Sequence, residues 1–188
     1  MGINVIIAGF GGQGVLMGGS VLVHGAMYEG KYVTWMPSYG VEMRGGTANC
    51  TVVISEEEIG SPVIGRPQNV IALNLPSKQK FEKLLKPGGL MIINSSLIEA
   101  KVQREDVNVL YIPLNKMADE LGESRSLNMI ALGAYIELTK VVTAEHTLNA
   151  ITECFSKKRE VIEINKKALA LGMKFARENQ CSKAVQPA

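Results

Sequence analysis

The sequence has few cysteines, no strong charge of one sign and no long apolar run. Its three cysteines, Cys50, Cys154 and Cys181, are far apart and form no Cys-x-x-Cys motif. This pattern excludes the usual ligand sets of iron–sulfur clusters and structural zinc, and it is typical of a reduced intracellular compartment. No apolar run approaches the roughly 18 residues of a membrane span, and residues 1–8 lack a basic leader and a cleavage site. We therefore expect a cytoplasmic protein without membrane contact.

The net charge and the length of the chain indicate which partners and what domain organisation to expect. The chain has 20 Lys and Arg against 18 Asp and Glu, a net charge of +2, so its composition does not favour nucleic-acid binding. With 188 residues it can bury a sizeable core without disulfides or metal. We expect one α/β domain over residues 1–180 and a frayed polar tail over 181–188.

The first 36 residues have the pattern of a β-α-β unit. A nearly continuous apolar run at 3–8 predicts a buried strand, and the glycine-rich turn at 9–14 follows it directly. Apolar residues at three- and four-residue spacing then predict a helix over 15–28, whose buried stripe includes Val15, Leu22 and Met27. A second strand is predicted over 32–36 and ends at Pro37. The crossover should be right-handed.

The rest of the chain continues as alternating strands and helices. A strand at 47–55 should run antiparallel, because the link before it is too short for a helical crossover. A second β-α-β unit is predicted over 69–94, followed by a short strand at 109–112, short helices and a long amphipathic helix over 158–178. The predicted stripe of that helix consists of Val161, Ile164, Ala168, Leu171 and Phe175. Together these elements predict a three-layer, Rossmann-like α/β fold with a mostly parallel sheet, at least one antiparallel strand and a helical C-terminal part.

The glycine turn matches a dinucleotide-binding pattern only in part. Gly9, Gly11 and Gly14 fit G-x-G-x-x-G between a strand and a helix, where backbone amides can approach a phosphate. However, a NAD site needs an acid at the end of the second strand, and Trp35–Pro37 stand there. A tight turn that lets the helix pack closely is the alternative. Gln13 is not required by that alternative, and its amide can reach a ligand or a neighbouring chain.

A polar loop at 37–47 contains a phenol, a carboxylate and a guanidinium that no core pattern explains. Tyr39, Glu42 and Arg44 admit three interpretations. Glu42 and Arg44 can form an exposed ion pair of little energetic value. The loop can instead present Arg44 to an anionic ligand, since its fork binds carboxylate or phosphate bidentately, or it can anchor a partner. In a parallel pair both strands end at one edge, so we expect this loop beside the glycine turn.

These two segments together resemble one family. The glycine turn at 9–15, combined with the loop from Pro37 to Gly46, resembles the gamma subunit of 2-oxoacid:ferredoxin oxidoreductases, which oxidise pyruvate, 2-oxoglutarate or branched-chain 2-oxoacids to acyl-coenzyme A. The similarity extends over nearly the whole chain, including the helix that begins at Leu127–Met129. Each motif is weak alone, and the pair at this spacing is fairly specific.

The resemblance implies a division of labour within a complex. Alpha and beta subunits would hold thiamine diphosphate and Mg²⁺, a cysteine-rich, ferredoxin-like delta subunit would hold iron–sulfur clusters, and ferredoxin would accept the electrons. The gamma subunit would help close the shared site, would bind no cofactor or metal by itself, and would be inactive alone, with self-association as a further option. By position, Tyr39, Glu42 and Arg44 would support catalysis. The positions that would face the shared site or its coenzyme A approach are Gly9, Gly11, Gly12, Gln13, Gly14, Ser38, Gly45 and Gly46.

Two other functions remain open from the sequence. A self-sufficient nucleotide-dependent oxidoreductase is favoured by the glycine turn and opposed by the missing acid. A non-catalytic assembly module would use the same polar loop purely as an interface.

Overall fold

A computed structural model describes residues 2–39, 46–179 and 181–183. Within them, one mixed sheet has the strand order β2-β3-β1-β4-β5-β6-β7. The strands are β1 (Ile3–Phe10), β2 (Tyr32–Tyr39), β3 (Thr47–Ser55), β4 (Asn69–Ala72), β5 (Leu90–Asn94), β6 (Asn108–Ile112) and β7 (Ser182–Lys183). Strands β1, β4, β5 and β6 are parallel neighbours. Strand β3 is antiparallel to both β1 and β2, so the predicted antiparallel strand is confirmed.

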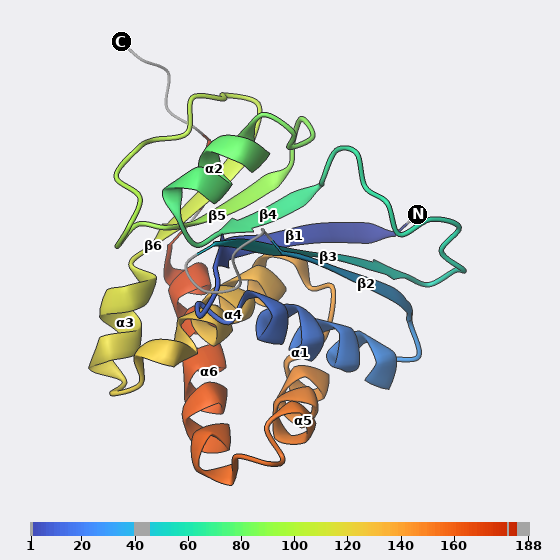
Figure 1. Cartoon of the computed structure of the whole chain (residues 1–188), viewed down its shortest axis with the longest axis vertical. Coiled ribbons are helices and arrows are strands. Elements are labelled where there is room, and N and C mark those ends of the chain that lie inside the picture. The colour runs from blue at the N-terminus through green and yellow to red at the C-terminus, as the bar shows by residue number, and fades with distance from the viewer. Residues whose placement is uncertain (1, 40–45, 180, 184–188) are drawn as a thin grey trace.

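Helices cover both faces of the sheet. They are α1 (Val15–Tyr28), α2 (Leu75–Glu82), α3 (Leu114–Glu120), α4 (Leu127–Thr139), α5 (Ala144–Cys154) and α6 (Ile162–Glu178), with short 3-10 turns η1 (Ser124–Ser126) and η2 (Arg159–Val161). Figure 1 shows α2 on one side of the sheet and α1, α4, α5 and α6 on the other. This is the predicted three-layer α/β class, with its helical C-terminal part.

Alternating side chains of the central strands fill two separate cores. On β1, Val5 and Ile7 belong to the larger core, which includes buried residues of α1, α4 and α6. Ile6 and Ala8 point the other way, into a smaller core that includes Phe81 of α2. The period of two along a strand produces this division, because successive side chains leave opposite faces. A continuous apolar run is therefore the signature of a strand covered on both faces.

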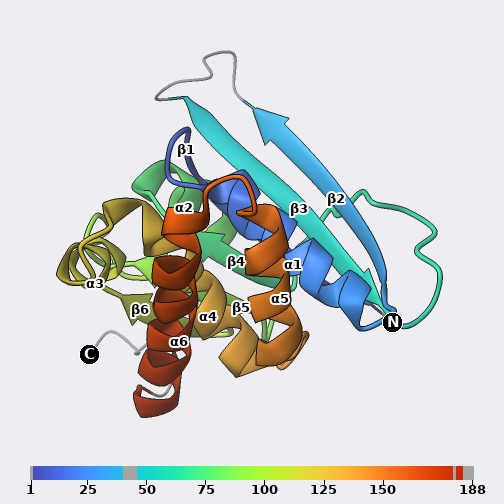
Figure 2. The ribbon, with the colours of Figure 1, turned by 90° about the horizontal axis from the view of Figure 1, so that it is seen from below.

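The first β-α-β unit differs from its prediction in one respect. Strands β1 and β2 run in the same direction, but β3 lies between them and pairs with both. Strand β2 also continues past Pro37 to Tyr39. It forms the free edge of the sheet (Figure 2), where a proline is tolerated because the missing N–H can face away from the neighbour.

Two predicted helical stripes need correction. Met27 of α1 is 56% exposed, whereas the buried stripe of that helix uses its glycines as well as Val15, Leu22 and Ala26. On α6, Ile164, Leu171 and Phe175 are only partly buried. The buried stripe is Ile162, Asn165, Ala168, Leu169, Gly172 and Ala176.

The correction to α6 has a physical cause in its packing against α4. A Cβ atom added at Gly172 would lie 1.9 Å from the carbonyl oxygen of Ile130, and one added at Gly133 would lie 2.1 Å from that of Leu169. The two helices therefore touch backbone to backbone, and small residues define the contact. A pattern that scores only large apolar residues misses such an interface.

The C-terminal residues meet the sheet. Strand β7 pairs antiparallel with β6, with Ser182 opposite Val109 and Lys183 opposite Asn108. The frayed tail expected from residue 181 thus begins with a short edge strand, because the backbone of β6 offers it partners. Residues 184–188 lie outside the described part.

Candidate functional site at the carboxyl edge of the sheet

The glycine turn is locked to the start of α4. Gly14 caps α1 with φ 74°, a left-handed conformation that favours glycine. Its carbonyl oxygen accepts a hydrogen bond of 2.9 Å from Asn128 Nδ2, and an added Cβ at Gly14 would lie 2.4 Å from that nitrogen. The turn therefore needs glycine both for its backbone angle and for space. The sequence analysis did not predict that Asn128 contacts the glycine turn. A polar residue at the start of a strongly apolar helix could have indicated such a contact.

The amide of Gln13 holds the turn from inside. Its Oε1 accepts a hydrogen bond of 2.7 Å from the backbone N–H of Phe10. Its Nε2 donates to the carbonyl oxygen of Leu73, which follows β4, at 3.3 Å. The side chain therefore joins the ends of two neighbouring strands. The oxygen and the nitrogen of this side-chain amide each have a hydrogen-bond partner within the chain. The contact of Gln13 with a ligand or another chain, which the sequence suggested, therefore remains a prediction.

The glycine turn and the end of β2 lie side by side, as the topology predicted. The N–H of Gly11 donates to the carbonyl oxygen of Gly46 at 3.0 Å. A hollow of about 380 Å³ borders both segments and is lined by Phe10, Gly11, Gly12, Gly14, Val15, Leu16, Met17, Tyr39 and Ala48. Tyr39 is 56% exposed at its rim. Residues about 30 positions apart in the sequence thus form one surface.

Only part of the polar loop can be placed. Ser38 and Tyr39 are exposed at the end of β2, and Gly46 opens the following strand. Glu42, Arg44 and Gly45 lie outside the described residues, so the three interpretations of this loop stay as predictions. Gly9 packs under the turn, where an added Cβ would lie 2.6 Å from Gln13 Oε1 and 3.0 Å from Leu73 Cβ.

The chain topology makes this edge a natural binding position. After β1 the chain enters α1 on one face of the sheet, and after the neighbouring β4 it enters α2 on the other. Ligands of open α/β sheets bind at such switch points. Within the described residues, the first-turn amides of α1 have no side-chain cap, and that turn contains no acidic residue. The positive end of this helix therefore remains available to an anion.

Cys50 and His24, which could in principle carry chemistry, have structural roles. Cys50 is fully buried, its Sγ lies 3.5 Å from the carbonyl oxygen of Val15, and burial raises the pKa of its thiol to about 12. His24 Nδ1 lies 2.8 Å from the carbonyl oxygen of Ser20 on its own helix. Among the described residues, no cluster of His, Cys, Asp and Glu could hold a metal ion.

No helix in the described ranges is both long and apolar enough to cross a membrane.

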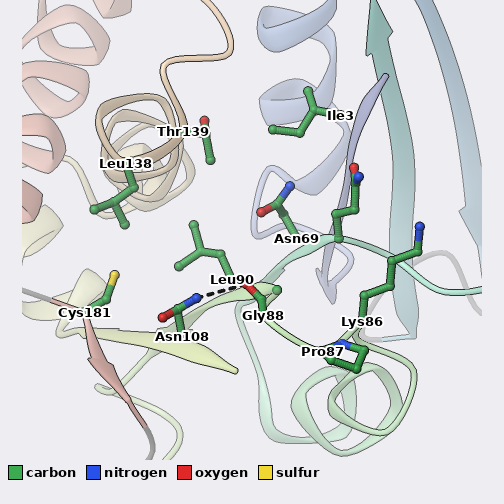
Figure 3. A pocket seen from close by; sticks show the side chains of 12 residues that line it. Ile3, Asn69, Lys86, Pro87, Gly88, Leu90, Asn108, Leu138, Thr139 and Cys181 are labelled. Carbon is green, nitrogen blue, oxygen red and sulfur yellow. Dashed lines mark hydrogen bonds between the residues drawn. The ribbon is translucent and has the colours of Figure 1, made fainter. Parts of the chain in front are cut away.

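A larger hollow lies at the opposite, amino edge of the parallel strands. It has a volume of about 650 Å³ and reaches from Ile3 and Leu90 to Leu138 on α4, as Figure 3 shows. Two of its amides are bonded within the chain: Asn108 Nδ2 donates to the carbonyl oxygen of Gly88 at 2.9 Å, and Asn69 Nδ2 donates to that of Asn4 at 2.8 Å. Size alone therefore does not mark it as a site.

Comparison with known proteins decides the family. The model of the pyruvate ferredoxin/flavodoxin oxidoreductase family matches residues 4–175. The chain belongs to this family. The resemblance inferred from the glycine turn and the polar loop is thereby confirmed.

Curated relatives fall into two groups by length. The ketoisovalerate oxidoreductase subunit VorA of Methanothermobacter marburgensis is 38% identical over 178 residues, which cover 94% of this chain but 37% of the relative. The chain therefore spans little more than a third of that relative. The 2-oxoglutarate synthase subunit KorC of Methanocaldococcus jannaschii is 33% identical over 178 residues, covering 93% of this chain and 94% of the relative.

Solved structures repeat the fold. The gamma subunit of a keto/oxoacid ferredoxin oxidoreductase from Geobacter sulfurreducens has a TM-score of 0.81 at 28% identity and covers 94% of this chain and 99% of its own. A 2-oxoglutarate:ferredoxin oxidoreductase from Magnetococcus marinus reaches a TM-score of 0.87 at 24% identity, and the match spans all of this chain and 33% of that one. The second likeness concerns the fold alone.

Proposed function

We propose that this chain is the gamma subunit of a cytoplasmic, thiamine diphosphate-dependent 2-oxoacid:ferredoxin oxidoreductase. The complex would convert a 2-oxoacid and coenzyme A to acyl-coenzyme A and carbon dioxide, and pass two electrons to ferredoxin. Residues 1–180 would act as one domain. Thiamine diphosphate, Mg²⁺ and iron–sulfur clusters would be held by alpha, beta and delta partners, and the isolated chain would be inactive.

The observation that carries this proposal is the meeting of the glycine turn with the end of β2. The exposed Tyr39 at the end of β2 lines the same hollow as Phe10, Gly11 and Gly12, and a Gly11–Gly46 hydrogen bond of 3.0 Å joins the turn to the residue before β3. A surface with an available helix amino end and an exposed phenol suits contact with a charged partner site. Arg44 would contact an anionic group of that site, and Tyr39 and Glu42 would orient it or hold the loop against the partner.

The names of the relatives narrow the substrate class. Ketoisovalerate oxidoreductase and 2-oxoglutarate synthase subunits are both among them, so we propose a branched-chain 2-oxoacid or 2-oxoglutarate as substrate. Anaerobic affinity purification of the chain from its host, followed by 2-oxoacid-dependent reduction of a viologen dye, tests the assignment. Co-purification of a thiamine-binding chain with dye reduction supports it. Dye reduction by the isolated chain would contradict it.

Two variants separate an active-site role of the loop from a purely adhesive one. In the assembled enzyme, Arg44→Ala should lower turnover by about tenfold or more, the loss of one charge-assisted contact, and leave the complex intact. Lys86→Ala, at the amino edge, is the matched charge removal and should change turnover less than about twofold. Dissociation of the Arg44→Ala complex would instead favour the non-catalytic assembly module.

A further inference from the structure

Strand β2 is an edge strand whose free side is not paired by any other strand of the described chain. The opposite end of the sheet is closed by β7, which pairs with β6, whereas β2 pairs with β3 alone. In Figure 2, β2 runs along the outer rim of the sheet and no helix lies beyond it. Tyr32 and residues 35–39 are exposed. An exposed edge of this length is a template for pairing with another strand.

The side chains of β2 have the composition of a protein interface. Large apolar side chains that are 39–56% exposed are more frequent here than in any other strand or helix of the described chain, and they are Tyr32, Trp35, Met36 and Tyr39. Aromatic residues and Met are enriched at interfaces, and charged residues are depleted. The strand contains no charged residue, although lysine is a common protection of an exposed edge. Its surface is therefore suited to contact with another protein surface.

The pairing with β3 shows which backbone groups of β2 are free. The N–H of Gly11 donates to the carbonyl oxygen of Gly46 directly opposite, and successive residues of an antiparallel strand bond alternately to its two neighbours. Residues 48, 50, 52 and 54 of β3 therefore direct their backbone groups toward β1. Their partners on β2 are Tyr39, Pro37, Trp35 and Val33. The backbone groups of these four residues point to the free side, where Pro37 has no N–H to donate.

One register lets β2 pair with a second copy of itself without a lost hydrogen bond. In an antiparallel pair with Thr34 on the two-fold axis, Val33 faces Trp35 of the second copy, and the two residues exchange both N–H···O=C bonds. The pairing ends where Lys31 faces Pro37. This end costs nothing, because the N–H of Lys31 already donates within its own chain at 3.1 Å. An axis at Trp35 would set Val33 against Pro37 and lose hydrogen bonds.

The same register places complementary side chains opposite each other on both faces. Thr34 faces its own copy, and its Oγ1 is buried without a hydrogen-bond partner among the described residues. Opposed threonines stabilise a strand pair through their hydroxyls. On that face Tyr32 lies opposite Met36 of the second copy, a favourable sulfur–aromatic contact. On the other face Val33 lies opposite Trp35, an aromatic and β-branched pair. No like charges meet.

The area that this pairing covers is that of a weak dimer. A fully buried aromatic side chain covers about 150–250 Å², and Tyr32 and Trp35 are 49% and 42% exposed. Each therefore leaves on the order of 90 Å² to be covered. With Met36 and the paired backbone, the two copies together bury roughly 1,000 Å², the lower limit of a specific interface. We expect a Kd on the order of 50 µM.

We propose that β2 is a self-association surface, through which two copies of this chain form an antiparallel dimer with one continuous sheet. The two-fold axis passes beside Thr34, and the paired segment runs from Tyr32 to Met36. This dimer is a property of the isolated chain, so it does not rest on the function proposed above.

Analytical ultracentrifugation of the purified full chain under reducing conditions tests the association. Between about 5 and 500 µM, sedimentation should change from that of a monomer to that of a dimer. Met36→Lys places a charge opposite Tyr32 and should weaken the dimer about tenfold or more. Leu97→Lys introduces the same charge at a 49% exposed position after β5, and as the matched control it should leave the affinity unchanged. Circular dichroism confirms that each variant is folded.

Cysteine cross-linking tests the register, in a chain that carries Cys154→Ser and Cys181→Ser. Residues that face each other in a non-hydrogen-bonded pair have Cα atoms about 4.5 Å apart, within the range of a disulfide. Thr34→Cys should therefore give about tenfold more disulfide-linked dimer than Met36→Cys, because the two copies of Met36 lie more than about 10 Å apart. Random collision predicts the reverse order, since Met36 is more exposed than Thr34.

Three results would overturn the proposal. The first is a natural chain that stays monomeric at about 500 µM, and the second is cross-linking of Met36→Cys as readily as of Thr34→Cys. The third is a monomeric chain in which the amides of Val33 and Trp35 become protected from hydrogen exchange only within the assembled enzyme, which would assign the edge to another subunit. None of these results bears on 2-oxoacid turnover.

Discussion

The two edges of the sheet differ in where their polar groups find partners. At the amino edge, the larger hollow is lined by amides that bond to backbone carbonyls of the same chain. At the carboxyl edge, the smaller hollow beside the glycine turn is bordered by the amino end of α1, whose cap residue Gly14 has no side chain, and by the exposed Tyr39. The two edges therefore differ in how their amides and helix ends are bonded, and volume alone does not distinguish a site from a packing gap.

The network that closes the amino edge further illustrates this difference. Glu29, at the end of α1, receives Lys31 Nζ at 2.9 Å and the N–H of Thr143 at 2.6 Å, with His146 Nδ1 at 3.2 Å. Burial alone would raise the pKa of Glu29, but hydrogen bonds from Lys31, Thr143 and His146 outweigh it and lower the pKa to about 2. The charge of Glu29 therefore stabilises the contact between α1 and α5.

The largest expected effect compares two glycines of equal φ at opposite edges. Gly14 and Gly88 both have φ 74°, but an added Cβ meets Asn128 at Gly14 and nothing within 4 Å at Gly88. Gly88→Ala should cost about 1 kcal/mol of unfolding free energy from backbone strain, and Gly14→Ala about 3 kcal/mol, because Asn128 must move. Urea denaturation measures both. Equal losses would mean that the carboxyl edge adapts freely.

A smaller effect is expected from Glu29→Gln at the amino edge. At pH 7 the variant should lose about 1 to 2 kcal/mol of unfolding free energy, because two charge-assisted hydrogen bonds weaken. The folded-state pKa of Glu29 is lowered to about 2 from 4.5, so its contribution is complete above about pH 4.5 and disappears as the pH falls toward 2. Urea midpoints between pH 7 and pH 2.5 should therefore converge.

The exposed Glu58 provides a matched control for that titration. Glu58→Gln removes the same charge from a turn outside the network, so its unfolding free energy should stay within about 0.5 kcal/mol of that of the natural chain at every pH. A pH-independent deficit in Glu29→Gln would show that the carboxylate charge is not what joins α1 to α5.

The smallest effect on folding is expected at Tyr39. Because its side chain is 56% exposed, Tyr39→Ala should change the unfolding free energy of the isolated chain by less than about 0.5 kcal/mol, while turnover of the assembled enzyme falls. Stability is read from urea denaturation and turnover from viologen reduction. If Tyr39→Ala keeps full activity and unchanged stability, Tyr39 has no role in the site.

The sequence predicted the strands and the edge that carries the site, but not every contact. Apolar runs located β1 and β5, and strand direction placed the glycine turn beside the end of β2. The insertion of β3 between β1 and β2 was not predictable, because spacing fixes direction and not neighbours. The α4–α6 contact was hidden because Gly133 and Gly172 have no apolar side chain. The hydrogen bond from Asn128 to Gly14 joins residues 114 positions apart, which no local pattern reveals.

Hydrogen–deuterium exchange of the chain, alone and within the assembled enzyme, tests most directly whether the carboxyl edge faces the shared site. The account predicts that assembly protects residues 9–17 and 38–46, and leaves residues 86–90 at the amino edge unchanged. Protection confined to residues 86–90, with residues 9–17 and 38–46 exchanging as fast as in the isolated chain, would contradict it.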